Sequence, residues 1–197
     1  MFRHLPFDDA EFDAVVSVDA FEYFGTDVQL LPALLRVLKP GGRIAVSTPA
    51  LKVDPYLQAP PEQVSALAGW EVAGWHAPEW WRRHWELTGL LEDVTARMQP
   101  GSRDDWLLWA RASGATNDDA LVTMLESVGR DDIGFALVSA VRSSPPSACR
   151  PRGHTGRPSS ARHLPLGTYC VRPVRGSVTA SSAQLLLRRS RSSVTDW

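Results

Sequence analysis

The sequence predicts an α/β domain followed by a segment of a different kind. Two observations lead to this division. Runs typical of buried strands alternate with helical patterns over residues 1–142, and the composition changes abruptly near Ser143. The 197 residues are 44% apolar and 22% charged, which suits one globular domain with or without a tail. We therefore treat 1–142 and 143–197 as separate regions.

The first part of the domain predicts a strand, a helix and a second strand. Residues 12–19 form an apolar run rich in valine and bounded by acids, typical of a strand buried on both faces. Thr26 and Gln29 form a possible capping box, and apolar residues then recur at helical spacing until the Gly turn at 39–42. A second strand follows over 43–48, closed by Pro49. This order is the crossover unit of an α/β fold.

The remainder of the domain is expected to add four helices and two strands after a proline-rich connection. Pro78 suits the first turn of a helix, and Gly89 follows its end. Asn117 is a candidate cap for the last helix. The expected helices cover 61–68, 78–88, 104–112 and 118–128, the first of them short, and the expected strands cover 90–98 and 133–141.

The C-terminal region, 143–197, has the composition of a disordered tail. It holds eleven Ser, six Pro and nine Arg but no Lys, and its formal charge is +8 against −9 for 1–142. Such a stretch has too little apolar surface to offset its ordering entropy. It is either a basic tail that binds nucleic acid or sequence produced by readthrough or a frame shift. The absence of Lys favours the second, and we expect no nucleic-acid partner.

Several protein classes are excluded by the sequence. No run approaches the ~18–20 apolar residues of a membrane helix, and Pro6 and Asp8 follow the start too closely for a secretory signal, so we expect a cytoplasmic protein. The two cysteines, Cys149 and Cys170, both lie in the tail. Without Cys-x-x-Cys spacing, neither a zinc site nor a disulfide framework is indicated.

Four short motifs resemble the second half of the class I S-adenosylmethionine-dependent methyltransferases, over about residues 5–142. The Leu-Lys-Pro-Gly-Gly turn before a strand is the most specific of them. The resemblance implies a partial Rossmann-like sheet with flanking helices, and S-adenosylmethionine as cofactor. The motifs are Leu5-Pro6-Phe7 with Phe12-Asp13-Ala14-Val15, Asp19-Ala20 with Tyr23-Phe24-Gly25, Leu38-Lys39-Pro40-Gly41-Gly42, and Pro78-Glu79-Trp80-Trp81 with Trp85, Thr88 and Gly89.

In that family the cofactor is held mainly by a glycine-rich turn and by acids that end the second and third strands. Residues 1–142 contain no Gly-x-Gly pattern before a helix. The resemblance therefore implies an N-terminally truncated fragment with impaired activity. It also implies that the strand over 13–18 has an unpaired edge, through which we expect self-association.

The loop after the first strand supplies the candidate cofactor and catalytic residues. It lies at the carboxyl end of a strand, where open α/β sheets bind ligands. The resemblance implies that Leu5, Asp19, Ala20 and Phe21 contact the cofactor. Glu22 and Tyr23 are candidates for a base or an orienting group. The alternatives are a turn-forming role for Leu5, a capping role for Asp19, an ordinary exposed Glu22 and a packing role for Tyr23.

Aromatic residues supply the candidate substrate site. Seven of the eight Trp fall between residues 70 and 109, a density that suits a wall around a small apolar molecule. Trp70, Trp75 and His76 are the predicted substrate-binding residues. Trp81 and Trp85, at i and i+4, are expected to pack their helix on the sheet. His76 is isolated, so no metal is predicted.

Two functions follow from these residues. The first is an S-adenosylmethionine-dependent methyltransferase that acts on a small molecule, which needs in-line positioning more than a strong base. The second is a non-catalytic α/β fragment or interaction protein without methyl transfer. No membrane partner is expected for either one.

Overall fold

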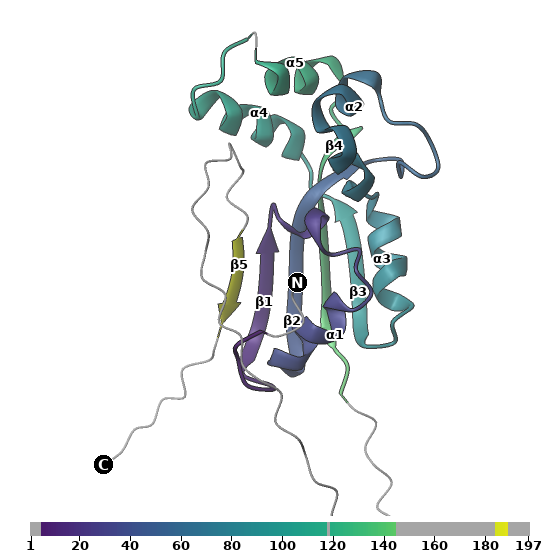
Figure 1. Ribbon diagram of the computed structural model, residues 1–197, viewed down its shortest axis with the longest axis vertical. Coiled ribbons are helices and arrows are strands. Elements are labelled where there is room, and N and C mark those ends of the chain that lie inside the picture. Colours follow the sequence, from purple (N-terminus) through teal and green to yellow (C-terminus); the bar gives the residue numbers. More distant parts are fainter. Residues whose placement is uncertain (1–4, 118, 145–183, 189–197) are drawn as a thin grey trace, which may run out of the picture.

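A computed structural model describes residues 5–117, 119–144 and 184–188 (Figure 1). Their centre is one mixed sheet in the order β3-β4-β2-β1-β5. The predicted α/β class is confirmed, and every predicted strand of the domain is present. The strands are β1 (Phe12–Val18), β2 (Leu38–Leu51), β3 (Leu91–Met98), β4 (Ile133–Arg142) and β5 (Gln184–Arg188).

Helices lie on one face of the sheet and beyond the carboxyl end of β1 (Figure 1). Asp119, not Asn117, caps α5, because its side chain accepts from the Leu121 N–H. The helices are η1 (Phe21–Tyr23), α1 (Leu30–Val37), α2 (Glu62–Ala68), η2 (Gly69–Gly74), α3 (Pro78–Glu86), α4 (Ser102–Ala112) and α5 (Ala120–Ser127).

Strands β1 and β2 are parallel, so the predicted crossover is confirmed. The glycine turn lies inside β2, where the register shifts and Gly41 has a φ of 74°. Pro49 does not end β2 as expected, and pairs with Phe135 of β4. The pairing with β1 ends at Ser47, so the missing N–H of Pro49 leaves no hydrogen bond of the β1 ladder unmade.

The main core joins the sheet to α1 and α3. Trp81 and Trp85 of α3 are 0% and 1% exposed and pack with Phe21 of η1. A second, smaller core lies under α2 and α5 and is built around Trp75 and Leu51. The main core thus anchors η1 through Phe21, and the smaller core anchors the chain after η2 through Trp75.

Strand β1 is buried on one face and not on both. Val15 is 1% exposed and packs in the core with α1 and α3, whereas Val16 is half-buried and Val18 is 43% exposed. The prediction of burial on both faces is therefore wrong. Helices α1 and α3 both pack on the Val15 face, so a continuous apolar run does not require two covered faces.

The segment predicted to be disordered contains β5, which pairs antiparallel with β1. Val16 lies opposite Leu186, for example. The free edge predicted for β1 is therefore not free, and the expected route to self-association is occupied by the same chain. The signal was the three leucines over 185–187, in an otherwise polar region. Residues 145–183 and 189–197 lie outside the described part of the chain.

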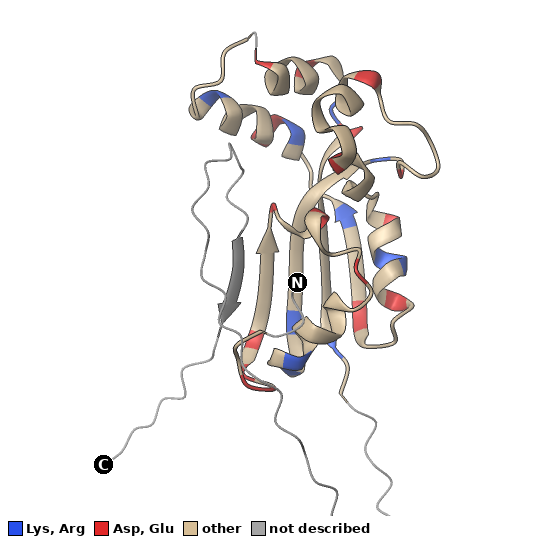
Figure 2. Cartoon of the chain, viewed as in Figure 1, with Lys and Arg blue, Asp and Glu red and all other residues tan. Residues whose placement is uncertain are grey.

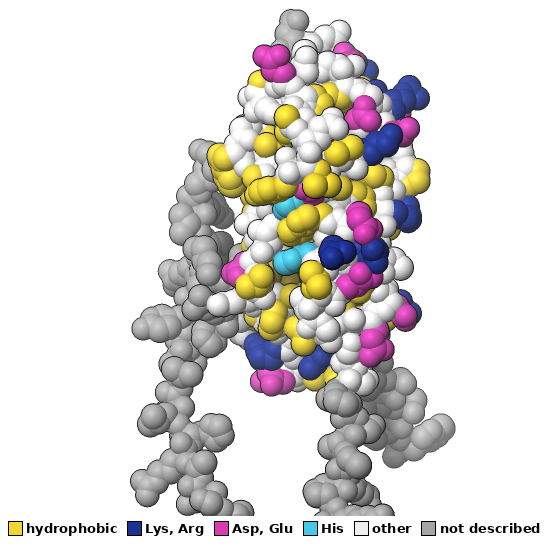
Figure 3. Space-filling model, turned by 90° about the vertical axis from the view of Figure 1, so that its right-hand side faces the viewer, with side chains coloured by type: hydrophobic (Ala, Val, Ile, Leu, Met, Phe, Trp, Pro, Cys, Tyr) yellow, Lys and Arg dark blue, Asp and Glu magenta, His cyan; other side chains and the backbone are white. Residues whose placement is uncertain are grey.

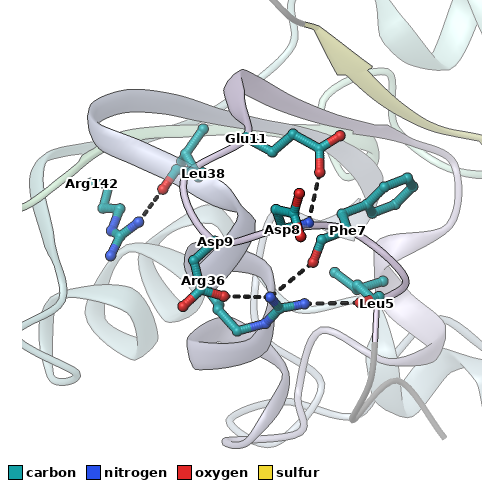
Figure 4. Close-up of polar contacts among 8 residues, drawn as sticks. All are labelled: Leu5, Phe7, Asp8, Asp9, Glu11, Arg36, Leu38 and Arg142. Carbon is teal, nitrogen blue, oxygen red and sulfur yellow. Dashed lines mark hydrogen bonds and ion pairs between the residues drawn. The ribbon is translucent and has the colours of Figure 1, made fainter. Parts of the chain in front are cut away.

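A cluster of polar contacts fixes the loop before β1 (Figure 4). The Arg36 guanidinium donates to the carbonyl oxygens of Phe7 and Leu5 at 2.9 and 2.8 Å, and it pairs with Asp9. Arg142 of β4 donates to the Leu38 carbonyl oxygen. These contacts tie the loop to the end of α1, at the amino end of β1. The carboxyl end of β1 takes no part in these contacts.

None of the helices among the described residues combines the length and the apolar character that crossing a bilayer requires.

Candidate functional site

The chain makes an abrupt turn at the carboxyl end of β1. Asp19 has a φ of 52°, in the left-handed region that Asp tolerates better than most residues. Its N–H donates to the Ser47 carbonyl oxygen at 2.8 Å, which continues the ladder with β2 by one step. The turn directs the chain into η1, and acidic residues mark this end of β1 and η1 (Figure 2). Glu22 and Tyr23 therefore lie just beyond the carboxyl end of β1.

Glu22 is a buried carboxylate, only 7% exposed. Its Oε2 accepts a hydrogen bond from Thr48 Oγ1 of β2 at 2.7 Å. Burial, aided by the nearby charges of Asp19 and Glu71 and opposed by the Thr48 hydrogen bond, raises the pKa of Glu22 to about 7. A group with this pKa can accept or release a proton at neutral pH. The alternative of an ordinary exposed glutamate is therefore wrong.

Helix η2 packs closely against η1. A Cβ atom at Gly74 would lie 2.6 Å from the Glu22 carbonyl oxygen, so only glycine allows this approach. The contact brings Glu71 to Tyr23, whose hydroxyl donates to Glu71 Oε2 at 3.4 Å. Burial, together with the Glu71 charge, raises the pKa of Tyr23 to about 12. Tyr23 is therefore a hydrogen-bond donor at neutral pH and does not serve as a base.

A buried carboxylate–imidazole pair lies next to Glu22 in space. His76 Nδ1 and Asp54 Oδ2 are 2.9 Å apart, and the two side chains are 3% and 5% exposed. Asp54 also accepts from the N–H groups of Tyr56 and Ala77. Burial lowers the pKa of His76, which the Asp54 hydrogen bond opposes. A neutral His76 that donates through Nδ1 keeps Nε2 as an acceptor.

Four rings stack in a column around this imidazole. Tyr56 and Trp80 lie on His76 at centroid distances of 5.4 and 3.5 Å, with interplanar angles of 14° and 5°. His84 continues the column on Trp80 at 4.7 Å. The face that carries α3 accordingly shows histidine among hydrophobic side chains (Figure 3). The i, i+4 spacing of residues 76, 80 and 84 is the sequence signal for this column.

Three cavities surround the turn, and we name each by one residue. The Asp19 cavity, of about 410 Å³, lies between β1, β4 and α4. The Glu22 cavity, of about 430 Å³, is lined by Glu22, Tyr23, Thr26, Tyr56, Trp70, Glu71, Ala73, Gly74, His76 and Trp80. The Trp75 cavity, of about 730 Å³, shares Trp106 and Trp109 with the first, and Tyr23 and Glu71 with the second. The cavities therefore form a series around η1.

The structure brings most of the predicted site residues to this series. Glu22, Tyr23, Trp70 and His76 line the Glu22 cavity, Asp19 lines its own, and Trp75 lines the third. Sequence reasoning missed Asp54, Thr48 and Glu71. Asp54 stands 22 positions before His76 in a turn, so no local spacing connects the two.

Three predicted cofactor residues lie elsewhere. The side chains of Ala20 and Phe21 are buried at 3% and 1%, and Phe21 packs on Trp81 in the core. Leu5 packs on the same core, and Arg36 binds its carbonyl oxygen toward the amino end of β1. Leu5 is thus not brought to the turn at Asp19. Ala20 and Phe21 can offer a ligand only their main chain.

Within the described ranges, no three His, Cys, Asp or Glu side chains form a group that could hold a metal ion.

Comparisons with known proteins agree with this architecture. Residues 1–46 match the family model described as "Methyltransferase domain". Among solved structures, phosphoethanolamine N-methyltransferase 2 of Haemonchus contortus, in complex with S-adenosyl-L-methionine, is similar with a TM-score of 0.57 and 18% identity, over 73% of this chain and 36% of that one. Geranyl diphosphate C-methyltransferase from Streptomyces coelicolor A3(2) has a TM-score of 0.52 and 22% identity, over 72% and 50% of the two chains. A search of curated proteins finds no match.

The fold is thus that of the class I S-adenosylmethionine-dependent methyltransferases, and the predicted resemblance is confirmed. The family match covers β1, η1, α1 and the start of β2, so it includes Asp19 and Glu22. The chain spans between about a third and a half of the length of these solved structures.

Proposed function

We propose that the chain transfers a methyl group from S-adenosylmethionine to a small molecule. The observation that carries this proposal is Glu22, a buried carboxyl whose pKa is about 7, at the carboxyl end of β1. Ligands of open α/β sheets bind at that end. The match of residues 1–46 to a methyltransferase domain supports the same reading.

The Asp19 cavity fits the charged centre of this cofactor. A sulfonium is a cation, and the lining supplies the Asp19 carboxylate together with the rings of Trp106, Trp109 and Phe135. When bound, the cofactor supplies an electrophilic methyl group. Asp19 would hold the sulfonium end, and the backbone of Ala20 and Phe21 would border it. A role for Leu5 rests on the resemblance alone.

The Glu22 and Trp75 cavities are proposed to hold the acceptor. Trp70, Trp75 and His76 would bind it, and Tyr23 would donate a hydrogen bond to it. Glu22 and His76 offer two proton-accepting atoms on the Glu22 cavity. Their work is to orient the acceptor and to remove a proton from it, while the order of the cavities sets its line of approach to the Asp19 cavity.

Calorimetry and a transfer assay on the full chain test this function. We expect saturable binding of S-adenosylmethionine below about 1 mM, and transfer of its labelled methyl group to a member of an amine and alcohol panel. Glu22→Gln should lower the transfer rate about 100-fold, as loss of a general base does. Glu62→Gln, an exposed acid on α2, is the control. Absence of cofactor binding, or equal rates in Glu22→Gln and wild type, would contradict the proposal.

A further inference from the structure

We propose that the Glu22 cavity binds an organic ammonium ion, so that the acceptor is an amine. This inference rests on the proposed function and names its substrate class. The cavity joins two carboxylates, two outward-facing aromatic rings and a neutral imidazole, and each of these makes a separate argument.

The charge on the cavity wall is negative. Glu22 and Glu71 both line it, and among the described lining residues none is Lys or Arg. The charges of Glu71 and Asp19 each raise the pKa of Glu22, so both repel the ionised form of this carboxyl. Within the described part of the chain, Glu71 receives one side-chain hydrogen bond, the 3.4 Å contact from Tyr23. A cation in the cavity would relieve this repulsion.

Two aromatic rings are open on the same wall. Trp70 and Tyr56 both line this cavity and are 77% and 73% exposed. Tyr56 rests one face on His76, which leaves its other face free. Both faces of Trp80 are covered by His76 and His84, so Trp80 offers only its edge. Trp70 and Tyr56 are therefore the rings that can lie against a cation.

Other acceptor classes fit this cavity less well. A phosphate or carboxylate group would meet Glu22 and Glu71 with no basic partner on the wall. A neutral alcohol would leave the two carboxylates uncompensated. An ammonium ion satisfies both carboxylates and both open rings at once.

The neutral imidazole supplies the step that an amine needs. An ammonium nitrogen must first lose one proton, which His76 Nε2 or the Glu22 carboxylate accepts. The nitrogen lone pair then forms a bond to the methyl carbon while the carbon–sulfur bond breaks, and the electron pair of that bond stays on sulfur. The products are the N-methylated ammonium ion, S-adenosylhomocysteine and a protonated base.

Binding of choline, compared with its uncharged isostere 3,3-dimethylbutan-1-ol, tests the proposal without any methyl transfer. Quenching of tryptophan fluorescence in the full chain at pH 8 reports the affinity. We expect choline to bind at least about tenfold more tightly than the alcohol. Glu22→Gln and Glu71→Gln should each weaken choline binding about three- to tenfold, with no change for the alcohol. Glu62→Gln removes one exposed charge outside the cavity and should stay within about twofold of wild type.

Each outcome is decisive. Equal affinity for choline and the alcohol, or wild-type affinity in both Glu22→Gln and Glu71→Gln, overturns the ammonium site. Glu71 is at the cavity surface, so its variant remains informative if Glu22→Gln does not fold. Methyl transfer to alcohols alone, without choline discrimination, would leave the proposed function standing and remove the amine. Choline discrimination without binding of S-adenosylmethionine would do the reverse.

Discussion

Two groups of aromatic residues, all between residues 56 and 85, differ in their exposure and in what they contact. Trp81 and Trp85 are 0% and 1% exposed and hold α3 on the sheet, whereas Trp70 and Tyr56 are 77% and 73% exposed on the rim of a cavity. The core pair touches Phe21, the residue before Glu22. The buried group therefore fixes the position of the turn, and the exposed group borders the space beside it.

Truncation of one member of each group should give the largest contrast. Trp85→Ala is expected to lower the free energy of unfolding by about 3–5 kcal/mol, because it empties a fully buried site. Trp70→Ala should change it by less than about 0.5 kcal/mol. Urea denaturation of both variants measures the difference. A similar cost for the two would mean that Trp70 is part of the core.

The second largest effect is expected at Glu22. This residue follows Phe21, which contacts the buried tryptophans, and it lines the cavity with Trp70 and Tyr56. The folded pKa of Glu22 is about 7 and its unfolded value 4.5, so its contribution to stability is present below pH 4.5 and is lost as the pH rises to 7. Glu22→Gln removes that loss. We expect the variant to gain on the order of 3 kcal/mol relative to wild type between pH 4.5 and pH 8, at ~1.4 kcal/mol per pKa unit.

His76 titrates in the opposite sense, so the Glu22 effect must be read as a difference. Burial lowers the folded pKa of His76, and stability is lost as the pH falls below 6.5. Wild type and Glu22→Gln both contain His76. The difference between their free energies of unfolding, measured by urea denaturation at each pH, therefore isolates the contribution of Glu22. If that difference stays constant from pH 4.5 to 8, the pKa of Glu22 is not perturbed.

A third, smaller effect concerns the pair that holds the cavity imidazole. Asp54→Asn replaces one carboxylate oxygen by an N–H₂ group, although Oδ1 accepts from Tyr56 and Oδ2 accepts from His76 and Ala77. We expect a loss of about 1–3 kcal/mol. The pKa of His76 should fall further, because the Asp54 charge is one of the causes that raise it. Urea midpoints and NMR titration of His76 measure these two changes.

The matched control for Asp54 is Asp132→Asn. Asp132 is 58% exposed, and its distance to Lys52 Nζ is 3.8 Å, so its ion pair should contribute less than about 0.5 kcal/mol. If the two asparagine variants have the same stability, Asp54 does not orient the imidazole.

The smallest effect lies within the core group itself. The Trp81 Nε1–H is buried with no hydrogen-bond partner among the described residues. Trp81→Phe removes this unsatisfied donor together with part of the ring, whereas the Trp85 indole nitrogen is not among the described buried side-chain atoms without a partner. We expect Trp81→Phe to be a milder change than Trp85→Phe by about 1 kcal/mol. Thermal midpoints of the two variants, compared with Trp85→Ala, measure it.

The sequence predicted the parts of this molecule that depend on local pattern. The β1–α1–β2 crossover, α3 with its i, i+4 tryptophans and the strand over 133–141 all follow from spacing and turn chemistry. The Asp54–His76 pair could not be predicted, because it joins a turn after β2 to the start of α3. The one-sided burial of β1 escaped for a similar reason. An apolar run does not reveal on which face the helices will pack.

The predicted site was incomplete in the same way. Glu22 was identified by its place after a strand, but its burial depends on η2 and on Gly74, which lie 50 positions further on. The resemblance assigned Phe21 to the cofactor site, but its side chain is buried in the core. The polar residues of the candidate site are brought together by contacts between distant segments of the chain. The helices and strands, in contrast, follow from local sequence patterns.

Strand β1 cannot pair with β5 until the C-terminal part of the chain has been synthesised. Val16 and Leu186 are neighbours in the sheet but about 170 positions apart in the chain. At ~5–20 residues per second, synthesis separates the two strands by roughly 10–30 s, far longer than the ~1–10 μs in which a hairpin closes. During that interval the backbone N–H and C=O groups on one side of β1 have no strand beside them, and such an edge is a template for other chains. Among the described strands β5 is the last to be made, and its pairing ends the period in which this edge of β1 is open to other chains.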